Sequence, residues 1–295
     1  MNPRTQFART AVDLVETDLS VALVYAEISG QYFGETEARH PDRVVNVGIR
    51  EQLLVNVGAG MALTGMRPIV HTFGSFLVER AFEQVKLGFG HQDVGGVLVG
   101  GLGSFDSAGM GRTHQTNGDV ALMDTLPGIH IHAPSTSVEV DAVVRRTVAG
   151  DGLHYVRVVG QTNSTSYAGT GLHVVRRGAG ATVVALGPVL DSVLPATEGL
   201  DVNVLYANTV RPFDSRGLRQ VLAAPDVVLV EPWLSGTSSR VVSETLSDLP
   251  HRVLALGVGR EELRRYGTPA DHVRFHGLDA AGLRRSLDAF LPIAA

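Results

Sequence analysis

The sequence predicts an α/β protein built from two doubly wound domains. Short runs rich in Val, Ile and Leu alternate with helical stretches over almost all of the 295 residues. Most of these runs are continuously apolar, which is typical of parallel strands covered by helices on both faces. Many of the 34 glycines fall where strands would end, as expected of loops that approach a ligand. A chain of this length can bury two separate cores.

The first half of the chain contains the elements of the first domain. The helix expected at 137–149 follows TSVE, a capping-box pattern in which Thr136 and Glu139 satisfy free backbone groups at a helix start. We expect strands at 21–25, 44–47, 68–71, 97–99, 129–132 and 154–158, and helices at 5–16, 50–64, 76–88 and 137–149.

A segment rich in Gly, Ser and Thr, residues 160–180, lacks periodicity and is predicted to link the domains. We therefore place the first domain at 1–170 and the second at 171–295. A second α/β pattern follows the linker, with strands expected near 182–187, 202–206, 227–230 and 252–256 and helices near 189–198, 214–223, 237–247 and 279–290.

Composition narrows the classes of function. Hydrophobic residues make up 44% of the chain and charged residues 19%, which excludes a largely disordered protein. The net charge is -5, and without a basic stripe we expect no nucleic-acid partner. Without cysteine there is no thiolate nucleophile and no Cys-ligated zinc. No apolar run approaches a membrane span or a signal peptide, so we expect a cytoplasmic protein that does not bind membranes.

Glu51 occupies an informative position. In NVGIREQ (46–52) a strand ends at Val47, Gly48 makes the turn and Glu51 enters the first turn of a helix. Considered alone, Glu51 could simply complement the positive end of the helix dipole. The order of the other motifs along the chain gives it a more specific meaning.

These motifs together resemble the transketolase family. After NVGIREQ come PIVHTFGSF (68–76), RAFEQ (80–84), a Gly-rich loop that ends in GRTHQ (111–115), and APS (133–135) ahead of a helix. In order and spacing they resemble the family's pyrimidine-binding domain, and YANTVRPFD (206–214) and VLVE (228–231) resemble its carboxy-terminal domain. The resemblance extends over nearly the whole chain, and similar landmarks occur in 1-deoxyxylulose-5-phosphate synthase and in 2-oxo-acid dehydrogenase beta subunits.

The resemblance implies thiamine diphosphate as the cofactor and transfer of a two-carbon ketol unit between sugars or sugar phosphates. In this family a carboxylate bonded to the pyrimidine ring nitrogen selects the imino tautomer, which then removes a proton from the thiazolium carbon. Glu51 matches that carboxylate, and a partly desolvated Glu suits proton sharing.

Three more residues match cofactor contacts of the family. Phe76, and with it Phe73, occupies the position of the aromatic wall for the pyrimidine, which a flat apolar ring needs. Glu27 matches an acidic residue that follows the first strand near the cofactor. Core packing for the two Phe rings and a solvated loop position for Glu27 are the alternatives.

Three residues match or adjoin substrate contacts. His114, which also counts among the catalytic candidates, matches a histidine that contacts the donor's oxygens, and His71 precedes the aromatic motif. Arg157 resembles an arginine that binds sugar phosphate, a role suited to a guanidinium. A structural role is the alternative for each. The family's acidic residue before the Thr-His pair is absent at 109–111, where Gly, Met and Gly stand, so we expect altered sugar selectivity.

The diphosphate-binding half of the family is missing from this sequence. Its signature is Gly-Asp-Gly followed by a more distant Asn, which hold a divalent ion such as Mg²⁺ against the phosphates. Here GDG (150–152) is interpreted as a turn between a helix and a strand, because Asn163 follows too closely. We therefore expect a separate diphosphate-binding partner in an α2β2 complex, with the metal held by that partner and no metal ligand in this chain.

Two alternatives remain open at the level of sequence. One is the beta subunit of a 2-oxo-acid dehydrogenase or of another thiamine-diphosphate decarboxylating enzyme. The other is a non-catalytic regulatory subunit that kept the fold. The THQ loop (113–115) and the 208–214 segment favour transketolase over the first, and the presence of both Glu51 and Phe76 argues against the second.

Overall fold

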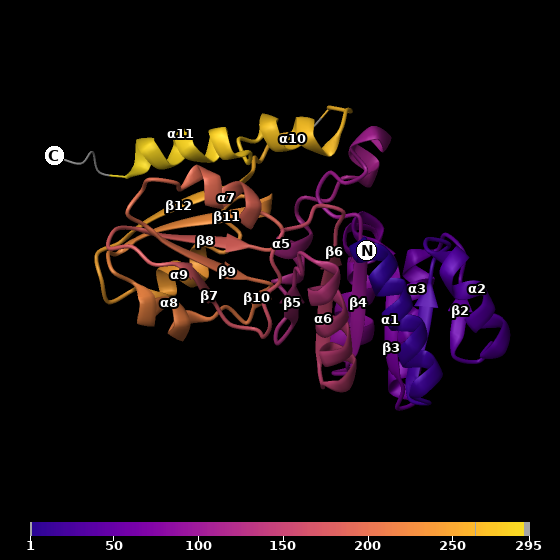
Figure 1. Ribbon diagram of the computed structural model, residues 1–295. Helices are drawn as coiled ribbons and strands as arrows, with labels where there is room; N and C mark the ends of the chain where they lie inside the picture. Colours follow the sequence, from indigo (N-terminus) through magenta and orange to yellow (C-terminus); the bar gives the residue numbers. More distant parts are fainter. Residues whose placement is uncertain (1, 263, 292–295) are drawn as a thin grey trace.

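Two β-sheets organise the part of the chain that the computed structural model describes, residues 2–262 and 264–291. The first sheet has seven strands in the order β10-β5-β6-β4-β3-β1-β2, and the second has five in the order β12-β11-β8-β9-β7. Figure 1 shows the two halves side by side, with α10 and α11 running along one side of the second half. This is the predicted α/β architecture.

The first sheet is parallel except for its β10 edge. Its strands consist almost entirely of buried residues because helices cover both faces. All six strands predicted for the first half are present, each within two residues of its expected ends. They are β1 (Val21–Tyr25), β2 (Val44–Asn46), β3 (Arg67–Phe73), β4 (Gly96–Gly101), β5 (His130–His132) and β6 (Leu153–Val158).

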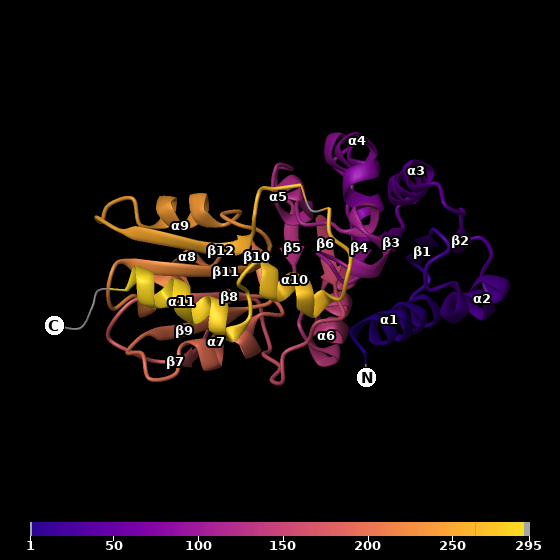
Figure 2. The same cartoon turned by 90° about the horizontal axis from the view of Figure 1, so that it is seen from above.

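Helices form a layer on each face of this sheet, as Figure 2 shows from above. On one face lie α1 (Pro3–Thr17), α2 (Gly30–Arg39) and α6 (Ser137–Ala149), and on the other lie α3 (Glu51–Leu63), α4 (Phe82–Gln84) and α5 (Asp119–Met123). In α6, Thr136 caps the Glu139 amide as the sequence predicts. Of these, α2 and α5 were not predicted, since their ends carry only weak cap signals. Within the described residues, no helix combines the length and apolarity that crossing a membrane requires.

The helix predicted at 76–88 differs from a regular α-helix. Wide π-helical turns at Ser75–Arg80 and Val85–His91 flank the short α4. Such turns are rare and occur mostly at functional sites. Phe76 and Arg80 lie on the same side of the first wide turn, with the Arg80 guanidinium 3.9 Å from the centre of the Phe76 ring.

The second sheet forms the core of the second half. It contains β7 (His173–Arg176), β8 (Thr182–Leu186), β9 (Asn203–Ala207), β11 (Asp226–Leu234) and β12 (Arg252–Val258). Its flanking helices are α7 (Leu190–Ala196), α8 (Ser215–Val221), α9 (Ser239–Thr245), α10 (Pro269–Phe275) and α11 (Ala280–Phe290). The four predicted strands and four predicted helices are all present. Only α10 among these helices was not expected.

Two strands depart from the expected division of the chain. The predicted linker, 160–180, contains β7, which pairs antiparallel with β9. The short β10 (Thr209–Arg211) leaves the second half and pairs antiparallel with β5 of the first sheet. The two halves therefore share backbone hydrogen bonds. The boundary at residue 170 stays a prediction.

Two glycines of α3 provide a matched test of this packing. A Cβ at Gly58 would overlap the buried Val70 side chain of β3, whereas a Cβ at Gly60 meets no heavy atom within 4 Å. We predict that Gly58→Ala lowers the free energy of unfolding by about 1–3 kcal/mol through overpacking. Gly60→Ala raises it by up to about 1 kcal/mol through helix propensity. Denaturant unfolding measures both, and equal effects would contradict this packing.

Candidate active site

One cavity lies beyond the carboxyl ends of the parallel strands, where open α/β sheets bind ligands. Its volume is about 350 Å³. Glu27 follows β1, Glu51 follows β2, Phe73 ends β3 and His114 follows β4. The lining residues are Arg4, Ala26, Glu27, Ile28, Ser29, Gln31, Ile49, Glu51, Phe73, Phe76 and His114. Five of the seven predicted site residues therefore meet around one space.

Glu51 is the first residue of α3, and its side chain is almost completely buried. The Arg80 guanidinium donates to its Oε2 over 2.5 Å, and the Thr72 hydroxyl lies 3.5 Å from its Oε1. Free amides at the start of α3 add a favourable field. A carboxylate buried at a cavity wall without a charged partner would be costly, so the pair with Arg80 compensates Glu51.

Three rings line the same cavity. The centres of Phe73 and Phe76 are 5.6 Å apart, and the His114 ring contacts both edge-on, at 5.3 and 5.0 Å. Partial burial, followed by the charge of Arg80, lowers the pKa of His114. At neutral pH His114 is therefore mainly the neutral imidazole, which donates one hydrogen bond and accepts another. The Thr113 hydroxyl lies 2.9 Å from its Nδ1.

Glu27 is the exposed residue of a turn at the cavity rim whose neighbours Ala26 and Ile28 are buried. Its backbone is left-handed, with φ at 59°, and so is that of Ser29 at 69°. Such a conformation costs energy in residues other than Gly and is concentrated at functional sites. Asn46 holds this turn, because its Oδ1 accepts from the Glu27 amide over 3.2 Å.

His71 does not reach the cavity, which corrects its prediction as a substrate contact. Its ring is fully buried behind Ser29, with Nε2 3.1 Å from the Ser29 hydroxyl and Nδ1 2.9 Å from the Val99 carbonyl oxygen. Burial lowers the pKa of His71 to about 4. The neutral ring therefore donates from Nδ1 to Val99 and accepts at Nε2 from Ser29, which positions that hydroxyl.

Arg157 is also outside the cavity, contrary to the prediction that it binds a substrate phosphate. Only 1% of Arg157 is exposed. Its Nε donates to the buried Asp119 carboxylate over 2.7 Å and its Nη2 to Ser104 over 2.5 Å. The guanidinium is thus neutralised inside the protein, where a substrate cannot reach it.

Sequence reasoning missed two arginines at the site. Arg4, from α1, lines the cavity and lies 3.4 Å from the Ser29 hydroxyl through its Nε. Arg80 pairs with Glu51 and covers a face of Phe76. Arg4 has no local motif to mark it. Arg80 could have been found from its spacing, because it lies four residues after Phe76 and hence on the same side of the helix.

Comparison with known proteins identifies the family. Residues 1–162 match the model of the transketolase pyrimidine-binding domain. The chain belongs to the transketolase family. This is a family of thiamine-diphosphate enzymes, and the Glu51 cavity lies within the matched residues.

Solved transketolase structures share the fold along the whole chain. A structure described as a split-gene transketolase, an inactive beta4 tetramer, has a TM-score of 0.84 and 25% identity and covers 98% of both chains. A transketolase from Campylobacter jejuni has a TM-score of 0.78 at 16% identity, over 98% of this chain and 46% of that one. The chain therefore has the dimensions of a split transketolase subunit.

Two curated relatives differ in how much of their own length this chain covers. An uncharacterised 33.6 kDa protein of the fasciation locus of Rhodococcoides fascians is 46% identical over 97% of this chain and 94% of its own. The 1-deoxy-D-xylulose-5-phosphate synthase of Oleidesulfovibrio alaskensis is 30% identical over 95% of this chain and 47% of its own. The chain thus spans about half the length of that synthase.

The burial of Arg157 can be tested by measuring the free energy of unfolding of a variant. We predict that Arg157→Ala lowers the free energy of unfolding by about 3–5 kcal/mol, because it leaves the Asp119 charge buried and unpaired. The matched control is Arg145→Ala, which breaks surface pairs with Asp13 and Asp141 and costs under about 1 kcal/mol. Wild-type stability of Arg157→Ala, with loss confined to phosphorylated sugars, would instead make Arg157 a substrate contact.

Proposed function

We propose that this chain is the cofactor-activating subunit of a two-component transketolase, which transfers a two-carbon ketol unit between sugars or sugar phosphates. The observation that carries the proposal is the grouping of Glu51, Phe76 and His114 around one cavity at the carboxyl ends of the sheet. A buried carboxylate beside an aromatic wall suits a flat, hydrogen-bonding ring such as the aminopyrimidine of thiamine diphosphate.

Each residue then has a defined task. When bound, thiamine diphosphate supplies a carbon nucleophile that carries the two-carbon unit. Glu51 holds a proton between its carboxylate and the pyrimidine ring nitrogen, and burial keeps that proton away from water. Phe76 and Phe73 orient the ring by contact with it. His114 donates a hydrogen bond to the donor's oxygens.

Arg80 has to move before a pyrimidine ring can contact Glu51 and Phe76. Its guanidinium is flat and donates to Glu51 while covering Phe76, so it uses the same two groups that the pyrimidine needs. Its side chain is 38% exposed, which gives it room to turn outward. We infer that the Glu51–Arg80 pair stabilises the free subunit and opens when cofactor and partner bind.

An exposed apolar surface next to the site supports a partner subunit. Ile49, Leu53 and Leu63 on and beside α3, and Leu87 on the neighbouring helix, are 42–69% exposed. Obligate interfaces bury such surfaces. We propose that a diphosphate-binding chain covers this face in an α2β2 complex and contributes the divalent ion.

The donor's anionic end is assigned to Arg4. Arg4 and Ser29 lie together on the cavity wall, which provides a cation and a hydroxyl in the cavity that His114 also lines. They take over the role that the buried Arg157 cannot perform. The Gly-Met-Gly loop at 109–111 offers no acidic contact, so sugar selectivity is expected to differ from that of the pentose-phosphate enzyme.

A second candidate function comes from the synthase relatives. The 30% identity to a 1-deoxy-D-xylulose-5-phosphate synthase favours a decarboxylating thiamine-diphosphate reaction. The reconstituted pair distinguishes the two when it is given either a ketose or pyruvate as donor. Carbon dioxide release from pyruvate would favour this second reaction.

The first functional test is Glu51→Gln. With the partner subunit present, we predict on the order of a 10²-fold or greater loss of ketol transfer, because the amide cannot share the proton. Complex formation, measured by gel filtration, should survive. The control Glu35→Gln makes the same change on α2, at a side chain that is 94% exposed, and should remain active. Near-normal turnover by Glu51→Gln would remove Glu51 from the mechanism.

Arg4→Ala tests the donor contact. Loss of a charge-assisted bond should lower kcat/KM for xylulose 5-phosphate by roughly ten- to a hundredfold, equivalent to about 1.5–3 kcal/mol. An unphosphorylated ketose donor should be affected much less. Equal loss with both donors would mean that Arg4 supports the fold and does not bind phosphate.

A further inference from the structure

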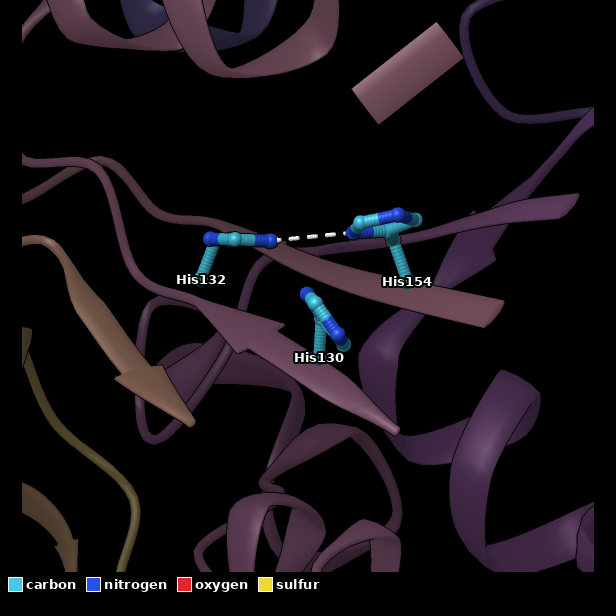
Figure 3. A group of neighbouring side chains, drawn as sticks. All are labelled: His130, His132 and His154. Atoms are coloured by element: carbon cyan, nitrogen blue, oxygen red, sulfur yellow. Dashed lines mark hydrogen bonds between the residues drawn. The ribbon is translucent and has the colours of Figure 1, made fainter. Parts of the chain in front are cut away.

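Three histidines form a cluster on the first sheet, away from the Glu51 cavity. His130 and His132 are two residues apart on β5 and so point to the same face. His154, near the amino end of β6, is the direct register partner of His130. Parallel pairing therefore places all three side chains on one face. Figure 3 shows the His130 ring directed toward the space between the other two.

The distances match those of ligands that share one metal ion. His132 Nε2 and His154 Nδ1 are 3.1 Å apart, and one nitrogen from each of the three rings lies within 4.8 Å of the others. Two nitrogens bound to one tetrahedral zinc, at metal–nitrogen distances of about 2.0–2.1 Å, are separated by roughly 3.3 Å. Small rotations of the exposed His130 side chain suffice to bring its nitrogen into place.

Hydrogen bonds around the cluster decide which nitrogens carry protons. His154 Nε2 lies 2.8 Å from the Asp151 carbonyl oxygen, so it must be the protonated nitrogen, which leaves Nδ1 with a lone pair. Asn208 donates its amide to the Tyr167 carbonyl and thereby turns its oxygen toward Thr209.

The Thr209 hydroxyl donates its proton to the side-chain oxygen of Asn208 over 3.2 Å. Since that proton is used, the hydroxyl accepts a hydrogen bond from His132 Nδ1 at 3.1 Å. His132 Nε2 is then left with a lone pair. The two proton-free nitrogens of His132 and His154 consequently face each other at 3.1 Å. Two facing lone pairs repel, and either a shared proton or a cation would resolve the conflict.

A cation would use both lone pairs. Because Nδ1 of His132 and Nε2 of His154 carry the protons toward Thr209 and Asp151, the two facing nitrogens are free to act as ligands of one ion. The hydrogen bonds that these rings donate to the Thr209 hydroxyl and the Asp151 carbonyl fix their orientation, as such outer partners do in metal sites.

We propose that His130, His132 and His154 bind one divalent transition-metal ion, best matched by zinc. Three imidazoles suit zinc among the biological metals. They also leave a fourth position open toward a cavity of about 660 Å³ that they share with Arg146 and Asp214. A buried guanidinium nitrogen of Arg146 has no hydrogen-bond partner among the described residues, so hydroxide or a small carboxylate fits the fourth position.

The proposed site lies between the two halves of the chain. His132 is the register partner of Thr209 on β10, the strand that the second half contributes to the first sheet. Metal binding would therefore connect β5, β6 and β10. None of the three histidines lines the Glu51 cavity, and the open fourth position would hold an exchangeable ligand.

The test uses the full chain, expressed without a polyhistidine tag and stripped with a chelator. Titration with Zn²⁺ alone should show one tight site and a rise in the midpoint of thermal unfolding. Co²⁺ should give the absorption bands of a tetrahedral site. His130→Ala removes an exposed ligand without opening the core and should weaken Zn²⁺ binding by at least about 100-fold, since losing an outer-shell partner alone costs about 10–100-fold.

Two further variants make the result specific. Thr209→Val, which removes the outer partner of His132, should weaken binding by about 10–100-fold. His91→Ala changes an exposed histidine outside the cluster and should bind Zn²⁺ like the wild type. Equal Zn²⁺ affinity of the wild type and His130→Ala, or no tight binding by the wild type, would overturn the proposal.

Discussion

The contact on which the site depends is the one between the Glu51 carboxylate and the Arg80 guanidinium. Glu51 is 1% exposed, and a buried carboxylate is costly unless a positive partner or hydrogen-bond donors compensate it. The wide turn at Ser75–Arg80 provides that partner, and the same turn carries Phe76. One local distortion therefore builds both the charge pair and the aromatic wall. The pair also keeps a carboxylate poised at a cavity wall in a chain that, by our proposal, lacks half of its cofactor site.

The two ends of the first sheet have different chemistry. At the carboxyl ends of β1 to β4, loops bring acidic, aromatic and imidazole groups around one cavity. At the other end, β5 and β6 bring three histidines together where β10 arrives from the second half. Catalytic groups gather where strand ends leave backbone free to approach a ligand. The histidine cluster instead lies where the two halves are joined.

Much of the fold could be predicted from the sequence. Apolar runs such as Val21–Tyr25 and the capped helix Ser137–Ala149 correspond to the observed elements, because burial on both faces leaves a clear local pattern. Strand β10 could not be predicted, since its three residues gain their place by pairing with β5. At the site, Glu51, Phe73, Phe76, His114 and Glu27 were predicted from motifs, and the structure brings them together at one cavity. Arg157 and His71 were misplaced because burial is decided by packing, and Arg4 was missed because its position depends on how α1 crosses the sheet. The His-x-His of β5 was visible, but its meaning required the register with β6.

The central claim is that Glu51 and its neighbours form one half of a cofactor site that a second chain completes. The most direct measurement is a crystal structure of this chain in complex with its diphosphate-binding partner and thiamine diphosphate. The account predicts the pyrimidine ring nitrogen within hydrogen-bonding distance of the Glu51 carboxylate, about 2.6–3.2 Å, with Phe76 against the ring and Arg80 turned away. A complex in which the Glu51–Arg80 pair stays closed and the cofactor lies elsewhere would contradict it.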